Sequence, residues 1–157
     1  MLVLYDYYLN GIKNEDFNWI ESQNKMLEYS SKKLNILRFR GYLEIHREDA
    51  IEKQLQKTPI KKLGLTPLNM AEIYYDYKKY PKATEYLKQV KEKESLNYVV
   101  DLLKAMEKYY EALEVIISNK DNENMQLMVN DILKKKPHLK KDAEKLCDTY
   151  RVSLEFN

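Results

Sequence analysis

The sequence predicts an all-α protein, a right-handed α-solenoid of stacked helical hairpins with about ten helices. Strand patterns are missing, and the 157 residues include only 3 Gly and 4 Pro, which disfavours a fold with many turns. The segment Ala71–Ala83 is matched 29 residues later by Val100–Ala112. When the two segments are aligned, an acidic residue, a Lys, a Tyr and an Ala fall at the same positions in both. A fixed period of a few tens of residues is typical of stacked helical repeats.

Each copy of this repeat predicts a helix, a short turn and a second helix, because apolar residues recur at helical spacing on both sides of a central Lys. Ala83 and Ala112 are small, so we expect two helices to cross closely at each, near the usual ~8–10 Å separation. Ala50 is expected to take the same position in an earlier pair. The apolar positions of the two copies are Met70, Ile73, Tyr74, Tyr77, Ala83, Tyr86, Leu87 and Val90, then Leu96, Val99, Leu103, Met106, Ala112, Val115 and Ile116.

Four helices are expected before the repeat. The first covers residues 2–10 and is followed by Gly11, and the second is capped by Asn14 or Asp16 and runs to about Ser30.

The third expected helix runs from Ser31 to Arg47, and the fourth from Glu48 to Lys57. Gly41 costs ~1 kcal/mol inside a helix, so we expect a close helix crossing there. The segment from Thr58 to Leu65 contains both a Pro and a Gly, so it predicts a break.

Helix-start signals follow this break. Thr66 supplies a cap and Pro67 a preorganised first position, and Pro81 plays the same role for the second helix of that pair. Ser95 is expected to cap the next helix.

Two helices complete the chain. One starts at Asp121 or Asn122 and runs to about Lys136, and Pro137 opens the last, from Leu139 to about Arg151. We expect residues 152–157 to fray or to pack loosely.

Composition predicts one domain over residues 1–157 and excludes several function classes. No run approaches the ~20 apolar residues of a membrane span, and the apolar start has no basic segment before it. The single cysteine, Cys147, lies on an apolar face and is expected to be a core thiol. His46 and His138 are isolated, and CxxC, HExxH and Gly-rich phosphate-loop motifs are missing. We therefore expect no catalytic residues, no cofactor and no metal.

Two features suggest binding. Five lysines lie within residues 134–141, and they are either a solvated helix end or a patch for acidic lipid, nucleic acid or protein. Tyrosine is unusually frequent, with 14 residues. Several of these tyrosines fall off the inward stripes, and exposed Tyr is common at protein interfaces. The tyrosines in question are Tyr42, Tyr75, Tyr98 and Tyr110.

The run Lys33–Glu123 resembles a known family. Leu55-Gln56-Lys57-Thr58-Pro59-Ile60, which leads to Ala71-Glu72-Ile73-Tyr74, is similar to that family's Lys-rich helix end, its Ser-or-Thr-Pro-Ile-Gly turn and a helix containing Val-Glu-Ile. Lys79–Tyr86 is similar to its Lys-Tyr-x-x-Ala-x-x-Tyr, and Tyr110–Leu113 and Asn119–Glu123 continue in register. The family is the C-terminal helical region of the class C vacuolar protein sorting subunit sixteen. Leu37–Lys57 matches more weakly, Lys61 replaces the usual Gly, and residues 1–32 are not placed.

This resemblance implies a non-enzymatic scaffold. In the family the region docks a Sec1/Munc18-like subunit within tethering complexes at endosomes, vacuoles or lysosomes, and that subunit chaperones membrane-fusion SNAREs. Family members also carry an N-terminal β-propeller, so the chain is expected to be the C-terminal piece of a longer cytoplasmic protein. Membrane contact is then indirect, through other tethering-complex subunits.

Two alternatives stay open: a generic tetratricopeptide-like or clathrin-repeat-like adaptor, and a basic lipid- or nucleic-acid-binding helical domain using residues 134–145. Nucleic-acid binding through phosphates weakens steeply as the salt concentration rises. Affinity measured at several salt concentrations therefore distinguishes the last alternative from protein docking. We expect no nucleic-acid partner. The expected partner-binding residues are aromatic, basic or polar positions off the inward stripes: Arg38, Tyr42, Tyr75, Lys78, Lys88, Gln89 and Lys91.

Overall fold

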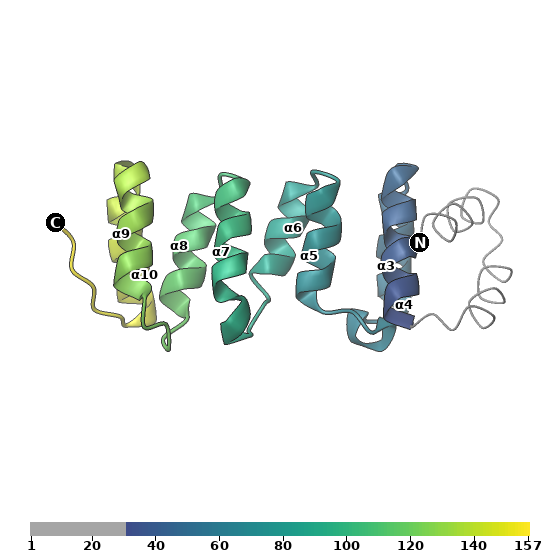
Figure 1. Cartoon of the computed structure of the whole chain (residues 1–157), viewed down its shortest axis with the longest axis horizontal. Helices are drawn as coiled ribbons and strands as arrows, with labels where there is room; N and C mark the ends of the chain where they lie inside the picture. Colours follow the sequence, from purple (N-terminus) through teal and green to yellow (C-terminus); the bar gives the residue numbers. More distant parts are fainter. Residues whose placement is uncertain (1–30) are drawn as a thin grey trace, which may run out of the picture. The chain divides into compact units, whose positions relative to one another are not determined.

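The computed structural model describes residues 31–157, and the regular secondary structure of this part of the chain is helical, with no strand. The predicted all-α class is confirmed, while the helices expected at 2–10 and 14–30 lie outside the described residues. No helix among the described residues is long and apolar enough to cross a membrane. The helices in Figure 1 are α3 (Ser31–Glu44), α4 (Glu48–Lys57), α5 (Pro67–Asp76), α6 (Tyr80–Leu87), α7 (Leu96–Ala105), α8 (Tyr109–Ser118), α9 (Met125–Lys135) and α10 (Lys140–Tyr150), with 3-10 turns at Ile60–Leu63, Lys93–Ser95 and Pro137–Leu139.

The chain divides into two compact units, one ending at Ala83 and one from Thr84 to Asn157. In the first unit, α3 packs against α4, α5 and the 3-10 turn at 60–63. The Nδ2 atom of the buried Asn35 donates to the carbonyl oxygen of Leu63 at 3.0 Å, which ties α3 to this turn. Large side chains fill the core of this unit: Leu34, Phe39, Ile51, Met70, Ile73 and Tyr74.

The same backbone turn joins three pairs of consecutive helices. His46, Lys78 and Glu107 have φ of 59°, 58° and 59°, in the left-handed region. In each case the following N–H bonds to the carbonyl oxygen five residues earlier, and Lys108 to Leu103 at 2.8 Å is one example. This Schellman arrangement ends the first helix and reverses the chain. It ends α3 at Glu44, earlier than the expected Arg47.

The position of these turns confirms the 29-residue repeat and corrects its extension to Ala50. Five residues after each left-handed residue come Ile51, Ala83 and Ala112, and all three are fully buried. Ala50 is only partly buried, because it lies one residue earlier, in the first turn of α4. A branched Ile therefore occupies the equivalent buried position in the first pair.

The break at residues 58–65 is confirmed. Gly64 has φ 75°, and a Cβ atom placed there would meet the Cβ of Lys32 at 3.4 Å, so the small residue suits both the conformation and the space. The helix that follows is capped as expected. The N–H of Asn69 donates to Thr66 Oγ1 at 3.1 Å, while the N–H of Thr66 donates to Asn69 Oδ1 at 3.0 Å.

In the second unit, α8 is central and packs against α7, α9 and α10. Its core confirms most of the inward positions expected from helical spacing, including Cys147. Three of the expected inward positions, Tyr86, Val90 and Val115, are only partly buried, as are Met128 and Leu133. The fully or almost fully buried side chains are Leu87, Val99, Leu103, Ala112, Leu113, Ile116, Ile117, Val129, Ile132 and Ala143.

Two local expectations for this unit are wrong, and a third is confirmed in part. Ser95 makes no side-chain cap bond, because the preceding 3-10 turn holds its backbone in a helical conformation (φ −90°, ψ −5°). α9 starts at Met125, since Asn122 Oδ1 accepts the N–H of Asn124 at 3.1 Å and closes a turn instead of capping a helix. Residues 152–157 pack loosely, which was one of the two expectations for them, because their apolar side chains are only partly buried. They are extended, and the side chain of Gln126 holds them by hydrogen bonds.

Candidate partner-binding surface and charged clefts

The expected partner-binding residues of the first unit differ in exposure. Tyr42 is only 6% exposed, so its expected outward position is wrong. α3 buries a face wider than one stripe, with Phe39, Tyr42 and Leu43 all inside. Burial of the Tyr42 phenol raises its pKa. A partner that docks on the outside of this unit therefore cannot use the Tyr42 ring.

The other residues expected in this unit are more accessible. Arg38 and Tyr75 are half-buried, and Lys78 is exposed at its left-handed position. The rings of Tyr75 and Tyr80 lie 5.8 Å apart, with their planes tilted by 33°. This contact orients the Tyr75 ring, and the residue stays partly exposed.

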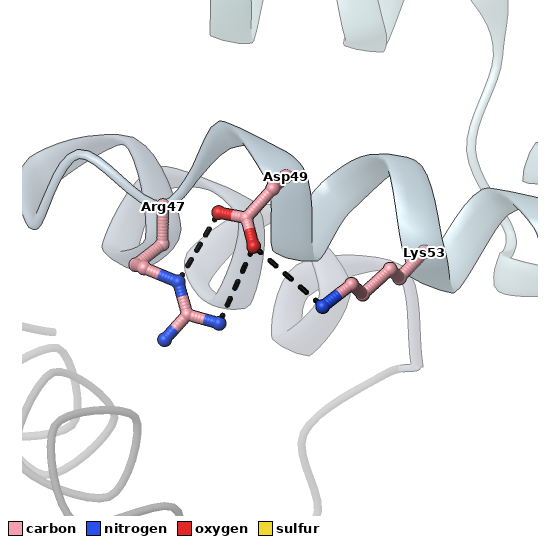
Figure 2. A network of polar contacts seen from close by, with 3 residues as sticks. All are labelled: Arg47, Asp49 and Lys53. Atoms are coloured by element: carbon pink, nitrogen blue, oxygen red, sulfur yellow. Dashed lines mark hydrogen bonds and ion pairs between the residues drawn. The ribbon is translucent and has the colours of Figure 1, made fainter.

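Ion pairs connect the helices of the first unit over its surface. Arg40 Nη2 lies 2.6 Å from Asp76 Oδ2, and Lys79 Nζ lies 3.8 Å from Glu48 Oε2. Figure 2 shows a local network at the start of α4, in which Asp49 Oδ1 accepts from Arg47 Nε at 3.1 Å and Asp49 Oδ2 lies 3.8 Å from Lys53 Nζ. The hydrogen bond from Arg47 is the main reason why the pKa of Asp49 is lowered. Acidic side chains on this surface are therefore ion-paired with neighbouring Lys and Arg.

In the second unit, Lys88, Gln89 and Lys91 are exposed. Lys88 Nζ lies 3.1 Å from Glu114 Oε2, and this contact raises the pKa of Lys88. Tyr150 Oη donates to the other oxygen of the same carboxylate at 3.5 Å. Glu114 therefore joins the segment after α6 to the end of α10, although Glu114 and Tyr150 were not expected to belong to a site.

Lys88 and Lys91 line one cleft of about 560 Å³, which lies entirely within the second unit. Its charged residues are balanced, with Lys88, Lys91 and Lys120 against Glu92, Glu114 and Asp121. Apolar residues also line the cleft, namely Val90, Leu96, Val99 and Val115. Such a surface suits a polar and apolar protein side chain better than a simple anion.

A second cleft of about 490 Å³ lies between α7 and α9. Leu127 on its rim is 71% exposed, and Val100 and Ile132 contribute apolar surface. Lys104 Nζ bonds to Asp131 Oδ2 at 2.9 Å, which lowers the pKa of Asp131. The sequence had indicated none of these residues as a site, since each belongs to an ordinary helical stripe.

The lysines of residues 134–141 are partly engaged. Lys134, Lys135 and Lys141 are exposed, while Lys136 Nζ lies 5.2 Å from the centre of the Tyr109 ring. Lys140 Nζ donates to the carbonyl oxygen of Asn157 at 3.1 Å. A cation over an aromatic face is attracted by the ring quadrupole, so Lys136 contributes to packing rather than to an open basic patch.

Within residues 31–157, no three His, Cys, Asp or Glu side chains lie close enough together to hold a metal ion. His46 is exposed at a helix end. Burial raises the pKa of the Cys147 thiol, with smaller contributions from Asp148 and Glu144. The thiolate is therefore disfavoured at neutral pH.

Comparisons of the chain with protein-family models, with curated proteins and with solved structures find no match.

Proposed function

We propose that the chain is a non-enzymatic helical-repeat scaffold, a solenoid of hairpins that docks a Sec1/Munc18-like subunit in a tethering complex of endosomes or vacuoles. The main support is the recurrence of one turn geometry at His46, Lys78 and Glu107, each followed five residues later by a buried side chain. Units that repeat both backbone turn and core position are those that stack into solenoids, which present long faces to protein partners. The partner's identity rests on the residue resemblance over Lys33–Glu123.

Two groups of residues are proposed to contact the partner. In the first unit they are Arg38, Tyr75 and Lys78, and Tyr42 is left out because its ring is buried. In the second unit the contacts are Lys88, Gln89 and Lys91, near the apolar residues that line the 560 Å³ cleft. Aromatic and Arg side chains on a folded surface are enriched at interfaces and frequent among binding hot spots. Localisation at endosomal or vacuolar membranes would follow from this docking and not from direct lipid contact.

The test changes Tyr75→Asp together with Lys78→Glu, and measures co-purification and titration calorimetry with candidate Sec1/Munc18-like proteins. We expect at least a tenfold loss of affinity, because an apolar ring and a cation are both replaced by carboxylates. The matched control is Tyr98→Asp with Lys141→Glu, which makes the same charge changes at exposed positions that are not among the proposed contact residues. Equal affinity of the two double variants, with unchanged helicity and melting temperature, would place docking elsewhere.

A second candidate is a generic tetratricopeptide-like or clathrin-repeat-like adaptor, which the same recurring turn favours. It predicts the same fold with a different partner. A dissociation constant of ~10 μM corresponds to a binding free energy of about −7 kcal/mol. If no Sec1/Munc18-like protein binds this tightly, this candidate is favoured over the tethering subunit.

A further inference from the structure

The last residues of the chain form an extended segment laid on α9 and on the start of α10. In Figure 1 this segment is the yellow coil that leaves α10 and turns back beside α9. Burial alternates along it: Val152, Leu154 and Phe156 are partly buried, while the residues between them are exposed. This period of two is that of a β-strand with one face covered.

Gln126 recognises the backbone of this segment. Its Nε2 donates to the carbonyl oxygen of Glu155 at 2.9 Å, and its Oε1 accepts the N–H of Glu155 at 2.8 Å. The carboxamide thus makes the two hydrogen bonds that a neighbouring strand would make. Asn130 Oδ1 accepts a further hydrogen bond from Gln126 Nε2 at 3.0 Å, which holds the carboxamide in this orientation.

The contacts at the end of the segment leave space and charge available. A cavity of about 350 Å³ adjoins Phe156 and Asn157, and it is lined by Leu133, Lys134, Pro137 and Lys140 among others. The Phe156 ring therefore does not fill its surroundings. Two lysines flank the cavity, and Lys140 already donates to Asn157 O at 3.1 Å.

We propose that this seat, formed by Gln126, Asn130, Leu133, Lys134 and Lys140, is a binding site for an extended segment of a partner protein, and that residues 152–157 are its internal ligand. The preferred ligand has apolar side chains at every second position, a large aromatic residue at the Phe156 position and an acidic residue after it. The aromatic residue would occupy the cavity, and the acidic residue would pair with Lys134 and Lys140. Because Gln126 bonds to the main chain, the ligand residues between the apolar positions can carry any side chain.

The internal segment can be displaced because its hydrogen bonds are exposed to water and its apolar side chains are only partly buried. A tethered ligand acts at an effective concentration in the millimolar range, so it masks the seat from weak external peptides. A better ligand overcomes this competition. This inference does not depend on the identity of the partner under the proposed function.

The test uses the full chain with Leu154→Ser and Phe156→Ser, which removes two apolar contacts of the internal ligand. A fluorescein-labelled peptide that reproduces residues 150–157 is titrated and its anisotropy measured. We expect the peptide to bind this double variant at least tenfold more tightly than the unaltered chain. Adding Gln126→Ala to the double variant should remove at least tenfold of that affinity, whereas adding Gln56→Ala, at an exposed position of α4, should not change it. Replacing the last two residues of the peptide by Trp and Asp should strengthen binding.

A second measurement covers the case in which the double variant does not fold. In the unaltered chain, the amide hydrogen of Glu155 should exchange slowly, and excess peptide should accelerate its exchange by displacing the segment. No effect of saturating peptide on this amide would overturn the proposal, as would equal binding with and without Gln126. A peptide-sensitive dimer at micromolar chain concentration would also overturn it, because the seat would then hold the tail of a second copy.

Discussion

Three buried side chains occupy equivalent positions in the helix pairs. Ile51, Ala83 and Ala112 follow their turns by the same number of residues, and none is exposed to water. Ala83 and Ala112 contribute only a methyl group each to the buried interior. Interiors are packed as densely as organic crystals, so extra atoms at these positions force a backbone shift.

Ala112→Leu is expected to lower the free energy of unfolding by about 1–3 kcal/mol, because three further carbon atoms overpack a fully buried position. Urea denaturation followed by circular dichroism measures this change. Ala105→Leu is the matched control, since Ala105 is exposed at the end of α7 and should change stability by no more than about 0.5 kcal/mol. Equal effects of the two substitutions would show that Ala112 does not lie at a close crossing.

Cys147 should be chemically inert and should make stability sensitive to alkali. Burial raises the thiol pKa above its value in the unfolded chain, so the folded state holds this proton more tightly. The contribution is fully present below the unfolded pKa of ~8.5 and is lost as pH rises through the higher folded pKa.

We therefore expect the stability difference between the unaltered chain and Cys147→Ala to shrink between about pH 8 and pH 10, as measured by urea denaturation. Because the two proteins share all other titratable groups, the titration of those groups cancels in this stability difference. Reaction with a maleimide at pH 7 should be slow in the folded chain and fast in urea. A pH-independent difference together with fast labelling would contradict the buried assignment.

The repeated turn is the feature that defines each helix pair. His46, Lys78, Glu107 and Arg151 adopt left-handed backbone conformations without being Gly, and each ends a helix. For an L-residue this conformation costs roughly 1–2 kcal/mol, which the two hydrogen bonds of the turn and the packing of the following helix offset. Because four such positions occur in the described residues, the left-handed conformation at these helix ends is stabilised by tertiary packing and not by the backbone freedom of Gly.

Glu107→Gly should raise the free energy of unfolding by about 0.5–1 kcal/mol, because Gly adopts the left-handed conformation without the steric penalty. Thermal melting and urea denaturation measure this effect. The control is Glu144→Gly, the same chemical change at an exposed position inside α10, which should destabilise by about 1 kcal/mol. Destabilisation of similar size at both positions would contradict the left-handed turn at Glu107.

Across the whole molecule, charge is abundant but balanced. The chain has 27 Lys and Arg against 25 Asp and Glu, and the ion pairs described above connect helices within each unit. Exposed pairs contribute little stability each, so their main effect is to set a mixed surface that disfavours non-specific collapse. The 560 Å³ cleft repeats this balance locally, with three cations and three anions.

The dissociation constant for duplex DNA or RNA should therefore exceed about 1 μM at ~150 mM salt, which is within the range of non-specific association. Lys136 packs on Tyr109 and Lys140 bonds to the chain end, which leaves fewer free cations than the sequence of residues 134–141 indicates. Fluorescence anisotropy at several salt concentrations provides the measurement. Sub-micromolar affinity that disappears in the Lys134→Glu, Lys135→Glu variant would reverse this prediction.

Features with local causes could be read from the amino-acid sequence. The helices of the repeat, the break at 58–65 and the cap at Thr66 depend on helical periodicity, on Pro and Gly, and on side chains three residues apart. The burial of Ala83, Ala112 and Cys147 could also be predicted from the sequence, since each falls on an apolar stripe. Of the expected partner-binding residues, Lys78, Lys88, Gln89 and Lys91 are exposed as their positions off the stripe indicated.

Features that depend on contacts between distant residues required the tertiary structure. Whether Tyr42 is covered depends on what packs over α3, and the equivalence of Ile51 to Ala83 depends on backbone torsion angles that many residue types can adopt. The pairing of Lys88 and Tyr150 with Glu114, and of Gln126 with Glu155, joins residues about 26 to 36 positions apart. Chain closure over such separations is determined by how whole helices stack, and no local pattern of side chains encodes it.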